Sequence, residues 1–397
     1  MELPLDPSVY RRRLEAVRAQ LEERGLDALY LSSPLSIFYV SGCWMAPTER
    51  PITLVVPLRR EPFLMAPGLE TEHAGVVAPF IEDVVTYFEY PDTVPPLVHM
   101  GRWMEERGLA QGRIGYDAPA TGVMGYRGPA LGDILPQAQF VPAGDLIARL
   151  RLVKQPEEIA YFRESARWGV RAQAVLQESL RENEFETVLS MEVSTRVSAE
   201  MLAALGPSYA WILGFGHGPA FAIFRGGQDT SFPHPLAFAR RLQRGDGCVT
   251  GCGAKVGGYN TELERTMFFG EPSAEQVRYF EIMRAIQEQA LDCFAPGRTG
   301  REVEADVRRL VEEAGVAQLL RHHTGHGIGL EIHEAPFIDL GDETELQPGM
   351  LFSCEPGLYV PGLGGFRHSD TVLITAEGRE VLTSAAPKDL ASVVINP

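Results

Sequence analysis

Two different periods of apolar positions alternate in the first part of the chain. Within residues 7–24, Tyr10, Leu14, Val17 and Leu21 recur at helical spacing, which predicts an amphipathic helix. Short apolar runs bounded by polar or turn-forming residues then predict strands. We expect a further helix at 96–107 and strands at 28–33, 52–58, 62–67 and 113–117. Strands that alternate with helices predict a small α/β domain.

A change of pattern marks a second domain. Pro156 suits the first turn of a helix, and Glu157 and Glu158 suit its positive end. We expect helices at about 156–181, 185–204, 273–294 and 300–315, and Gly-rich extended chain over 209–270 and 324–384. The sequence therefore predicts domains at 1–152 and 153–397, the second with an α+β fold of helices over a curved antiparallel sheet.

Two glutamates stand within a strand-like segment, residues 245–270. We expect this segment to form a hairpin that turns at residues 255–258. That turn places Gly251 directly opposite Glu262. Glu262 and Glu264 are two residues apart, so both side chains point to one face of their strand. Two carboxylates on one face belong either to a solvated sheet surface or to a site.

Histidines cluster in the segment HHTGHGIGLEIHEAP, residues 322–336. Four of the nine histidines lie there, beside a Gly-x-Gly pattern that permits a tight backbone turn next to His326. Histidine carries protons and binds metals near neutral pH, so four together favour a functional role over simple packing. His234 stands apart, between two prolines in SFPHP, where a lone histidine is typical of an exposed loop.

A carboxylate interrupts the apolar strand MLFSCEP. Burial of Glu355 is costly unless its charge is paired, so it needs a partner or a ligand. A turn at Gly362 places Ser369 opposite Glu355, with Arg367 and Asp370 on either side. We therefore expect a polar cluster where these two strands meet.

Charge and cysteine content exclude several classes of function. The chain has 53 acidic and 36 basic residues and a net charge of −17, so we expect no nucleic-acid or anionic-membrane partner. No apolar run approaches the ~18 residues of a membrane span, and the charged N-terminus is unlike a secretory signal. The five cysteines follow no disulfide or zinc spacing, which predicts reduced thiols and a cytoplasmic location.

These segments, in this order, resemble the M24 peptidase family, which includes prolidase, aminopeptidase P, creatinase and methionine aminopeptidase. The motifs that carry the resemblance are RLVKQPEEI, GGQDTSFPHP, YNTELERTMF, HTGHGIGLEIHE and SCEPGLYV through GFRHSDTVLIT. The resemblance implies a creatinase/prolidase-type N-terminal α/β domain, a C-terminal pita-bread fold and a homodimer.

The metallopeptidases of this family hold two metal ions with Asp, Asp, His, Glu and Glu. The corresponding positions in this chain are Gly251, Glu262, His326, Glu355 and Ser369. Two ligands are therefore lost and one is a longer carboxylate, although a pair of metal ions ~3.5–4 Å apart needs bridging carboxylates to offset its charge. We expect no metal, or one weakly bound divalent ion (Mn or Zn) on Glu262, His326 and Glu355.

Other residues resemble two different members of the family. The segment TELERT resembles creatinase, which works without metal, and this implies that His234 is the catalytic histidine and that Glu264 works with it. The segment HTGHGIGLEIHEAP resembles prolidase, which implies that His333 and Arg367 steer a peptide and its carboxylate. The predicted catalytic residues are His234, Glu264, His326, His333 and Glu355, and the predicted substrate-binding residue is Arg367.

Three functions stay open. The first is a C–N bond hydrolase acting on a small carboxylate-bearing substrate such as an Xaa-Pro dipeptide. The second is a metal-independent, creatinase-like hydrolase of another small amide or amidino compound. The third is a catalytically silent homologue that binds a ligand or a partner. The two enzymatic hypotheses require the predicted catalytic residues to converge on one cleft of the C-terminal domain.

Overall fold

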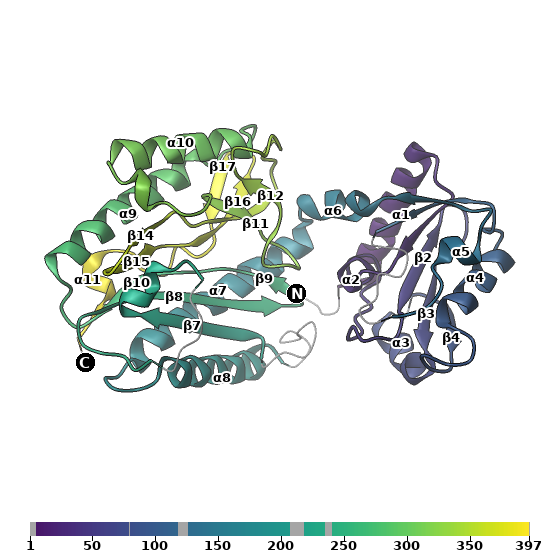
Figure 1. Cartoon of the computed structure of the whole chain (residues 1–397), viewed down its shortest axis with the longest axis horizontal. Helices are drawn as coiled ribbons and strands as arrows, with labels where there is room; N and C mark the ends of the chain where they lie inside the picture. Colours follow the sequence, from purple (N-terminus) through teal and green to yellow (C-terminus); the bar gives the residue numbers. More distant parts are fainter. Residues whose placement is uncertain (1–4, 79, 118–125, 207–217, 235–239, 397) are drawn as a thin grey trace. The chain divides into compact units, whose positions relative to one another are not determined.

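The computed structural model describes most of the chain, residues 5–78, 80–117, 126–206, 218–234 and 240–396. These residues form two compact units, divided in the sequence between Arg151 and Leu152. Each unit contains its own sheets and helices (Figure 1).

The N-terminal unit is built on one mixed sheet with the strand order β4-β3-β2-β1-β5-β6. The strands are β1 (Ala28–Leu31), β2 (Thr53–Pro57), β3 (Phe63–Pro67), β4 (Asp83–Tyr87), β5 (Arg113–Tyr116) and β6 (Gln139–Pro142). The helices are α1 (Pro7–Arg24), α2 (Pro34–Ser41), η1 (Gly68–Glu70), α3 (Thr71–Val77), α4 (Pro96–Glu106), α5 (Leu131–Ile134) and α6 (Gly144–Leu152). Strands β2 and β3, predicted at 52–58 and 62–67, pair in antiparallel fashion. Helices α4 and α5 lie on one side of the sheet, opposite α1 and α2 (Figure 1).

Helix α1 begins and ends with capping residues. The side chain of Asp6 accepts a hydrogen bond from the backbone N–H of Ser8, and Gly25 ends the helix with a left-handed φ of 61°. The buried face of α1 contains the four apolar positions that predicted it. This predicted helix is therefore confirmed.

Helix α2 is absent from the sequence predictions. Its sequence PLSIFYVS is apolar on all sides, and every residue from Ser36 to Ser41 is buried. A helix that is buried all round has no polar face, so its sequence lacks the periodic signal that reveals a surface helix.

The C-terminal unit contains a sheet of order β18-β10-β8-β7 with β9 beside β8, a sheet of order β12-β11-β13-β16-β17, and the pair β14-β15. Its strands are β7 (Ala220–Gly226), β8 (Asp246–Val256), β9 (Tyr259–Asn260), β10 (Thr266–Phe269), β11 (Gly325–Gly327), β12 (Glu334–Ile338), β13 (Leu351–Cys354), β14 (Gly357–Val360), β15 (Gly364–Arg367), β16 (Asp370–Thr375), β17 (Gly378–Val381) and β18 (Val394–Ile395). Its helices are α7 (Pro156–Ser179), α8 (Glu186–Leu205), η2 (Gly227–Ser231), α9 (Ala274–Cys293), α10 (Gly300–Glu313), η3 (Ala317–Leu319) and α11 (Leu390–Val393).

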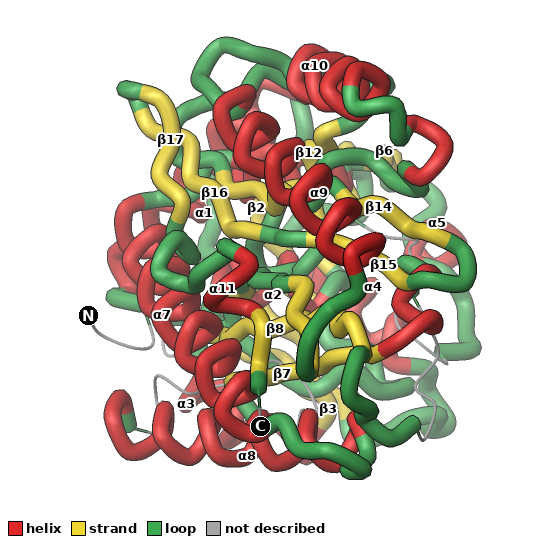
Figure 2. Tube along the Cα trace, turned by 90° about the vertical axis from the view of Figure 1, so that its left-hand side faces the viewer, coloured by secondary structure: helices red, strands yellow, loops and turns green. Residues whose placement is uncertain are grey.

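Helices cover both outer sides of these sheets. Helices α7 and α8 pack on β8 and β7, whereas α9 and α10 pack on β13, β15 and β12 from the other side (Figure 1 and Figure 2). The four helices predicted for this domain are confirmed as α7, α8, α9 and α10. The arrangement is the predicted α+β pita-bread fold, with the sheets between two helical layers.

The hairpin of β8 and β9 turns one residue later than predicted. Its turn consists of Gly257 and Gly258, whose φ angles are 59° and 88°. Two adjacent residues with positive φ are typical of two-residue hairpin turns, and glycine adopts this conformation without strain. The glycine pair therefore fixes the turn.

The later turn changes which residues stand opposite one another. Cys252 pairs with Leu263, so the neighbouring Gly251 stands opposite Glu264. The predicted pairing of Gly251 with Glu262 is wrong. Because the pairing moves by two residues, Glu262 and Glu264 still share the face on which Gly251 lies.

The predicted turn at Gly362 is confirmed. Strand β13 pairs with β16 and β14 pairs with β15 in one continuous register, so Glu355 stands opposite Ser369 as predicted. The backbone N–H of Glu264 donates to the carbonyl of Ser369 at 3.0 Å, and the N–H of Ser369 donates back at 3.1 Å. This pairing joins the two hairpins that carry the predicted site residues.

No helix in the described stretches has the length and apolar character needed to cross a membrane. All five cysteines are free thiols. Burial raises the pKa of Cys248, Cys252 and Cys354, which keeps these three thiols protonated.

We predict that the turn at Gly362 tolerates asparagine better than alanine. Gly362 has a φ of 79°, and an added Cβ would meet no atom within 4 Å, so backbone strain is the main cost of substitution. Gly362→Ala should lower the free energy of unfolding by about 1 kcal/mol, and Gly362→Asn by less, because asparagine adopts positive φ more readily. Urea titration measures both, and equal losses would contradict the strain argument.

Candidate active site

A cavity of about 400 Å³ opens in the C-terminal unit. Its lining includes every predicted catalytic, substrate-binding and metal-binding residue, namely His234, Glu262, Glu264, His326, His333, Glu355 and Arg367. The predicted convergence on one cleft is therefore observed, whereas the role of each residue stays a prediction. A cavity of this volume lies at the lower end of the range for ligand pockets and suits a small molecule.

Strands β7 and β8, together with the segment that contains Glu264, supply the floor of the cavity. The pairing of β7 with β8 places Ile223 opposite Gly251, which in turn stands opposite Glu264, so the three residues share one face. Phe221 and Arg225 flank Ile223 at two-residue spacing and also line the cavity. Glycine keeps this floor open, because a Cβ at position 251 would lie 3.1 Å from Ile223 and 3.8 Å from the carboxylate of Glu264.

Arg367 is bound by Glu264. Its Nη2 donates to Glu264 Oε1 at 2.5 Å, and its Nε faces the other carboxylate oxygen. Its Nη1 donates to the hydroxyl of Tyr359 at 3.1 Å, which lies 2.8 Å from Nε2 of His322. Burial raises the pKa of Glu264, and the positive charge of Arg367 opposes that rise. Binding of a substrate carboxylate by Arg367 stays a prediction, and such binding would compete with this ion pair.

His326 lies between two carboxylates. Its Nε2 is 3.1 Å from Glu355 Oε1 and 3.7 Å from Glu262 Oε2, and its Nδ1 is 3.1 Å from the carbonyl of Gly327. Burial disfavours the charged imidazolium, but the hydrogen bond with Glu355 and the charges of both carboxylates outweigh it and raise the pKa of His326 to about 9. A buried positive charge therefore stands between two acidic groups.

The pKa values of Glu262 and Glu355 shift in opposite directions. Burial and the charge of Glu355 raise the pKa of Glu262 to about 7. Burial also disfavours ionised Glu355, but the hydrogen bond from His326 and the charge of Arg367 outweigh it and lower its pKa to about 2. The buried hydroxyl of Ser369 donates to Glu262 Oε1 at 2.8 Å. Ser369 thus supplies a hydrogen bond at a position where the family resemblance implies a ligand carboxylate.

Two exposed histidines lie beside His326 in the cavity lining. The ring of His333 stacks on His326 with centroids 3.7 Å apart. Burial and the charge of His326 lower the pKa of His333, and His234 contributes to the same shift, so His234 lies near this stack. His234 reaches the site from the loop after η2, far from the other two in sequence.

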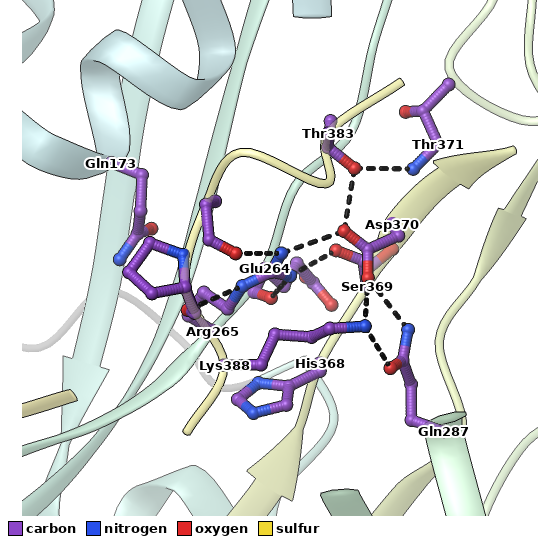
Figure 3. Close-up of polar contacts among 12 residues, drawn as sticks. Gln173, Glu264, Arg265, Gln287, His368, Ser369, Asp370, Thr371, Thr383 and Lys388 are labelled. Carbon is purple, nitrogen blue, oxygen red and sulfur yellow. Dashed lines mark hydrogen bonds and ion pairs between the residues drawn. The ribbon is translucent and has the colours of Figure 1, made fainter. Parts of the chain in front are cut away.

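Arg265 holds the backbone behind the cavity. Figure 3 shows its guanidinium among backbone carbonyls and the carboxylate of Asp370. Its Nη1 donates to the carbonyls of Glu264 at 2.7 Å and Ser369 at 2.9 Å, and its Nη2 donates to Asp370 Oδ1 at 2.8 Å. Lys388 donates to the other oxygen of Asp370 at 3.2 Å. Arg265 and Asp370 are fully buried, and their network fixes the backbone that carries Glu264 and Ser369.

Arg225, Arg265 and Tyr359 are parts of the site that were not predicted from the sequence. Strand alternation in AFAIFRG was the available signal for Arg225, because it assigns this residue to the cavity face of β7. Arg265 follows Glu264 directly and so points away from the cavity. Its partner Asp370 is 105 residues distant, and no local pattern reveals such a pair.

The donor set does not fit a pair of metal ions. Gly251 has no side chain, and Ser369 offers a neutral hydroxyl that is already bonded to Glu262, so these two positions offer no carboxylate to bridge two cations. The donors of one ion are present, in the groups Glu262, His326, His333 and Glu262, Glu264, Glu355, each with ligand atoms within 4.8 Å of one another. A single ion would compete with the proton and the ion pair on His326.

Comparison with known families matches residues 160–376 to metallopeptidase family M24 and residues 13–153 to the creatinase/prolidase N-terminal domain. Together these matches cover both units of the chain.

Relatives resemble the chain over nearly its whole length. An Xaa-Pro dipeptidase of Pyrococcus furiosus is 30% identical over 94% of this chain and 98% of its own. A probable dipeptidase PepE of Mycobacterium bovis is 31% identical over 98% of both chains. The crystal structure of dipeptidase PepE from Mycobacterium ulcerans is 28% identical, with a TM-score of 0.83 over 99% of this chain and 100% of that one.

We predict that Asp370→Asn destabilises the C-terminal unit by about 3–5 kcal/mol, because it leaves the buried guanidinium of Arg265 without its counter-charge. Burial disfavours ionised Asp370, but Arg265 and Lys388 outweigh it and lower its pKa to about 2. The lowered pKa stabilises the fold above the unfolded pKa of about 3.9, and this contribution is lost as the pH falls toward 2. The difference in free energy of unfolding between wild type and Asp370→Asn should therefore become smaller as the pH falls from 5 to 2.

Denaturant titration at several pH values measures this difference. Glu380→Gln is the matched control, because it removes one partner of an exposed pair with Arg163 and should cost less than about 1 kcal/mol. If Asp370→Asn were as stable as this control, the buried network would not make the proposed contribution to the free energy of unfolding.

We also predict that Gly251→Asp combined with Ser369→Glu strengthens binding of Mn²⁺. The Cβ at position 251 lies 3.8 Å from a Glu264 oxygen, so the added carboxylates would crowd existing ones, and cations would relieve their repulsion. Isothermal titration should show that the double variant binds Mn²⁺ more tightly than wild type does, and thermal unfolding should show a larger metal-induced rise in its Tm. A Gly75→Asp, Ser8→Glu variant adds the same charges elsewhere and should behave as wild type. Tight binding of two ions by wild type would contradict the assignment of lost ligands.

Proposed function

Because the chain belongs to metallopeptidase family M24, we propose that it hydrolyses a C–N bond of a small, carboxylate-bearing amide such as an Xaa-Pro dipeptide, and that it does so without a metal pair. One observation carries the proposal. One small cavity gathers an accessible imidazole, carboxylates and cationic groups, although two ligand positions lack carboxylates. The relatives named as Xaa-Pro dipeptidases support the substrate class.

His234 is the proposed proton carrier. It lines the cavity and is exposed, so water and substrate reach it. Histidine exchanges protons readily near neutral pH, which suits a group that takes a proton from the attacking water and gives it to the leaving nitrogen. His333 lies near His234 and is the proposed group that orients the substrate beside it.

Arg367 and His326 are the proposed electrostatic groups. Attack on an amide carbonyl develops negative charge on its oxygen, and fixed positive groups in a buried site stabilise that charge. Glu264 holds Arg367, and Glu355 holds His326, so neither cation must reorganise during the reaction. In this proposal the two cations supply the stabilisation that metal ions supply in metallopeptidases.

A creatinase-like reaction on an amidino compound is a second candidate. The observation in its favour is the group of three carboxylates within 4.8 Å of one another, since carboxylates bind amidinium groups through paired hydrogen bonds. The pairing of Glu264 with Arg367 weighs against it, because that carboxylate is already occupied.

We expect purified protein to cleave at least one Xaa-Pro dipeptide in the presence of a chelator, with activity unchanged by added Mn²⁺. His234→Ala should lower kcat about 100-fold or more, because it removes the proton carrier. His73→Ala is the matched control, since His73 lies in the N-terminal unit and pairs with Glu70. The assay incubates the protein with a panel of Xaa-Pro dipeptides and amidino compounds and measures the amine that each substrate releases.

Other outcomes would separate the alternatives. Activity that disappears with chelator and returns with Mn²⁺ would contradict the metal-independent mechanism. Cleavage of amidino compounds alone would favour the creatinase-like reaction. No turnover of any substrate, together with ligand binding, would favour a silent homologue.

We also propose a homodimer in the cytoplasm, as the family resemblance and the reduced thiols suggest. Light scattering of the purified protein and fractionation of cells test these two points.

A further inference from the structure

Arg225 is a cation of the cavity that no described acidic residue pairs with. It lies on β7, lines the cavity and shares the cavity face with Phe221 and Ile223. Its Nη1 donates to the carbonyl of Phe224 at 2.6 Å. Its Nε is buried and, within the described residues, has no hydrogen-bond acceptor. A buried donor without an acceptor is costly, so the guanidinium gains hydrogen-bond energy if it turns toward an acceptor in the cavity.

The other cations of the cavity are already paired. Arg367 is bound by Glu264, and His326 is bound by Glu355. Glu186 is near Arg225 and feels its charge, but its Oε1 already accepts hydrogen bonds from the N–H of Gly226 and from a second arginine. Arg225 is therefore the cavity arginine best able to accept a new anionic partner.

The position of Arg225 in the sheet sets the length of such a ligand. Arg225 stands opposite Val249, which stands opposite Thr266, so Arg225 lies two strands and two residues from Glu264. With strands ~4.8 Å apart and residues ~3.4 Å apart, the two Cα atoms are about 12 Å apart. A ligand of two residues, about 7 Å long, is shorter than this separation and therefore matches a site between the side chains of Arg225 and Glu264.

Several of the cavity side chains beside Arg225 are apolar. Ile223, Phe232 and Val249 line the same cavity, and Ile223 and Phe232 are among the exposed large hydrophobic residues. An apolar wall beside one arginine suits a ligand end that combines a hydrocarbon ring with a carboxylate, because the ring is desolvated while the charge is bound.

We propose that Arg225 binds the carboxylate of the substrate, and that this contact selects free acids over amides. The proposal rests on the proposed function. It assigns carboxylate recognition to Arg225 and leaves Arg367 in its ion pair with Glu264. Substrates of this class end in a free carboxylate on an apolar ring, as a C-terminal proline does.

The first experiment compares Ala-Pro with Ala-prolinamide as substrates of the full-length protein. Arg225→Gln should raise KM for Ala-Pro about 10–100-fold and change kcat less than threefold, because the contact binds substrate and transition state equally. The KM of Ala-prolinamide should not change. Arg225→Lys should lie between wild type and Arg225→Gln, and Arg196→Gln, an exposed arginine on α8, should match wild type. Equal effects on both substrates would overturn the proposal.

The second experiment needs no turnover. Isothermal titration with proline and with prolinamide measures recognition of the carboxylate directly. We expect wild type to bind proline more tightly than prolinamide, and Arg225→Gln to lose that preference. If no substrate is cleaved but proline binds through Arg225, the hydrolase function fails while carboxylate recognition stands. Equal binding of proline by wild type and Arg225→Gln, or binding by neither, overturns the proposal.

Discussion

The compensation of buried negative charge is the constraint on which the site depends. Three carboxylates share one wall of the cavity, Glu262, Glu264 and Glu355. Buried ions are tolerated only where partners replace the lost hydration. Because the donor set does not fit two metal ions, each carboxylate has a partner from the chain, in Ser369, Arg367 and His326 respectively. The lack of carboxylates at positions 251 and 369 and the pairing of the three carboxylates that are present are therefore two sides of one electrostatic balance.

Much of the fold was predictable from the sequence, because periodicity and capping are local properties. Helices α1 and α7 to α10 have a polar face and an apolar face, so their sequences reveal them. Helix α2 has no polar face and was missed. The register of the β8 hairpin was also missed, because the segment from Lys255 to Gly258 offers more than one turn centre. The positive φ of both Gly257 and Gly258 decides between them.

The members of the site were predictable, but their pairing was not. Residue type and family resemblance identified the histidines and carboxylates of the cavity lining. The pairing of Arg367 with Glu264 joins residues 103 apart in the sequence, and its geometry depends on the twist and spacing of several strands. Arg225 was not predicted as a site residue, because an arginine in a strand is ordinarily a surface residue. Only the three-dimensional structure shows that this face of β7 lines the cavity.

The backbone pairing of Glu264 with Ser369 affects the order in which activity and structure are lost on unfolding. This pairing joins the two hairpins that carry the site. Arg265 stabilises it through hydrogen bonds to the carbonyls of both residues. Separation of the hairpins would pull apart the carboxylates and their cations before either sheet had melted. As denaturant or temperature rises, activity should therefore be lost before helical content, because the cavity is the least stable part of the C-terminal unit.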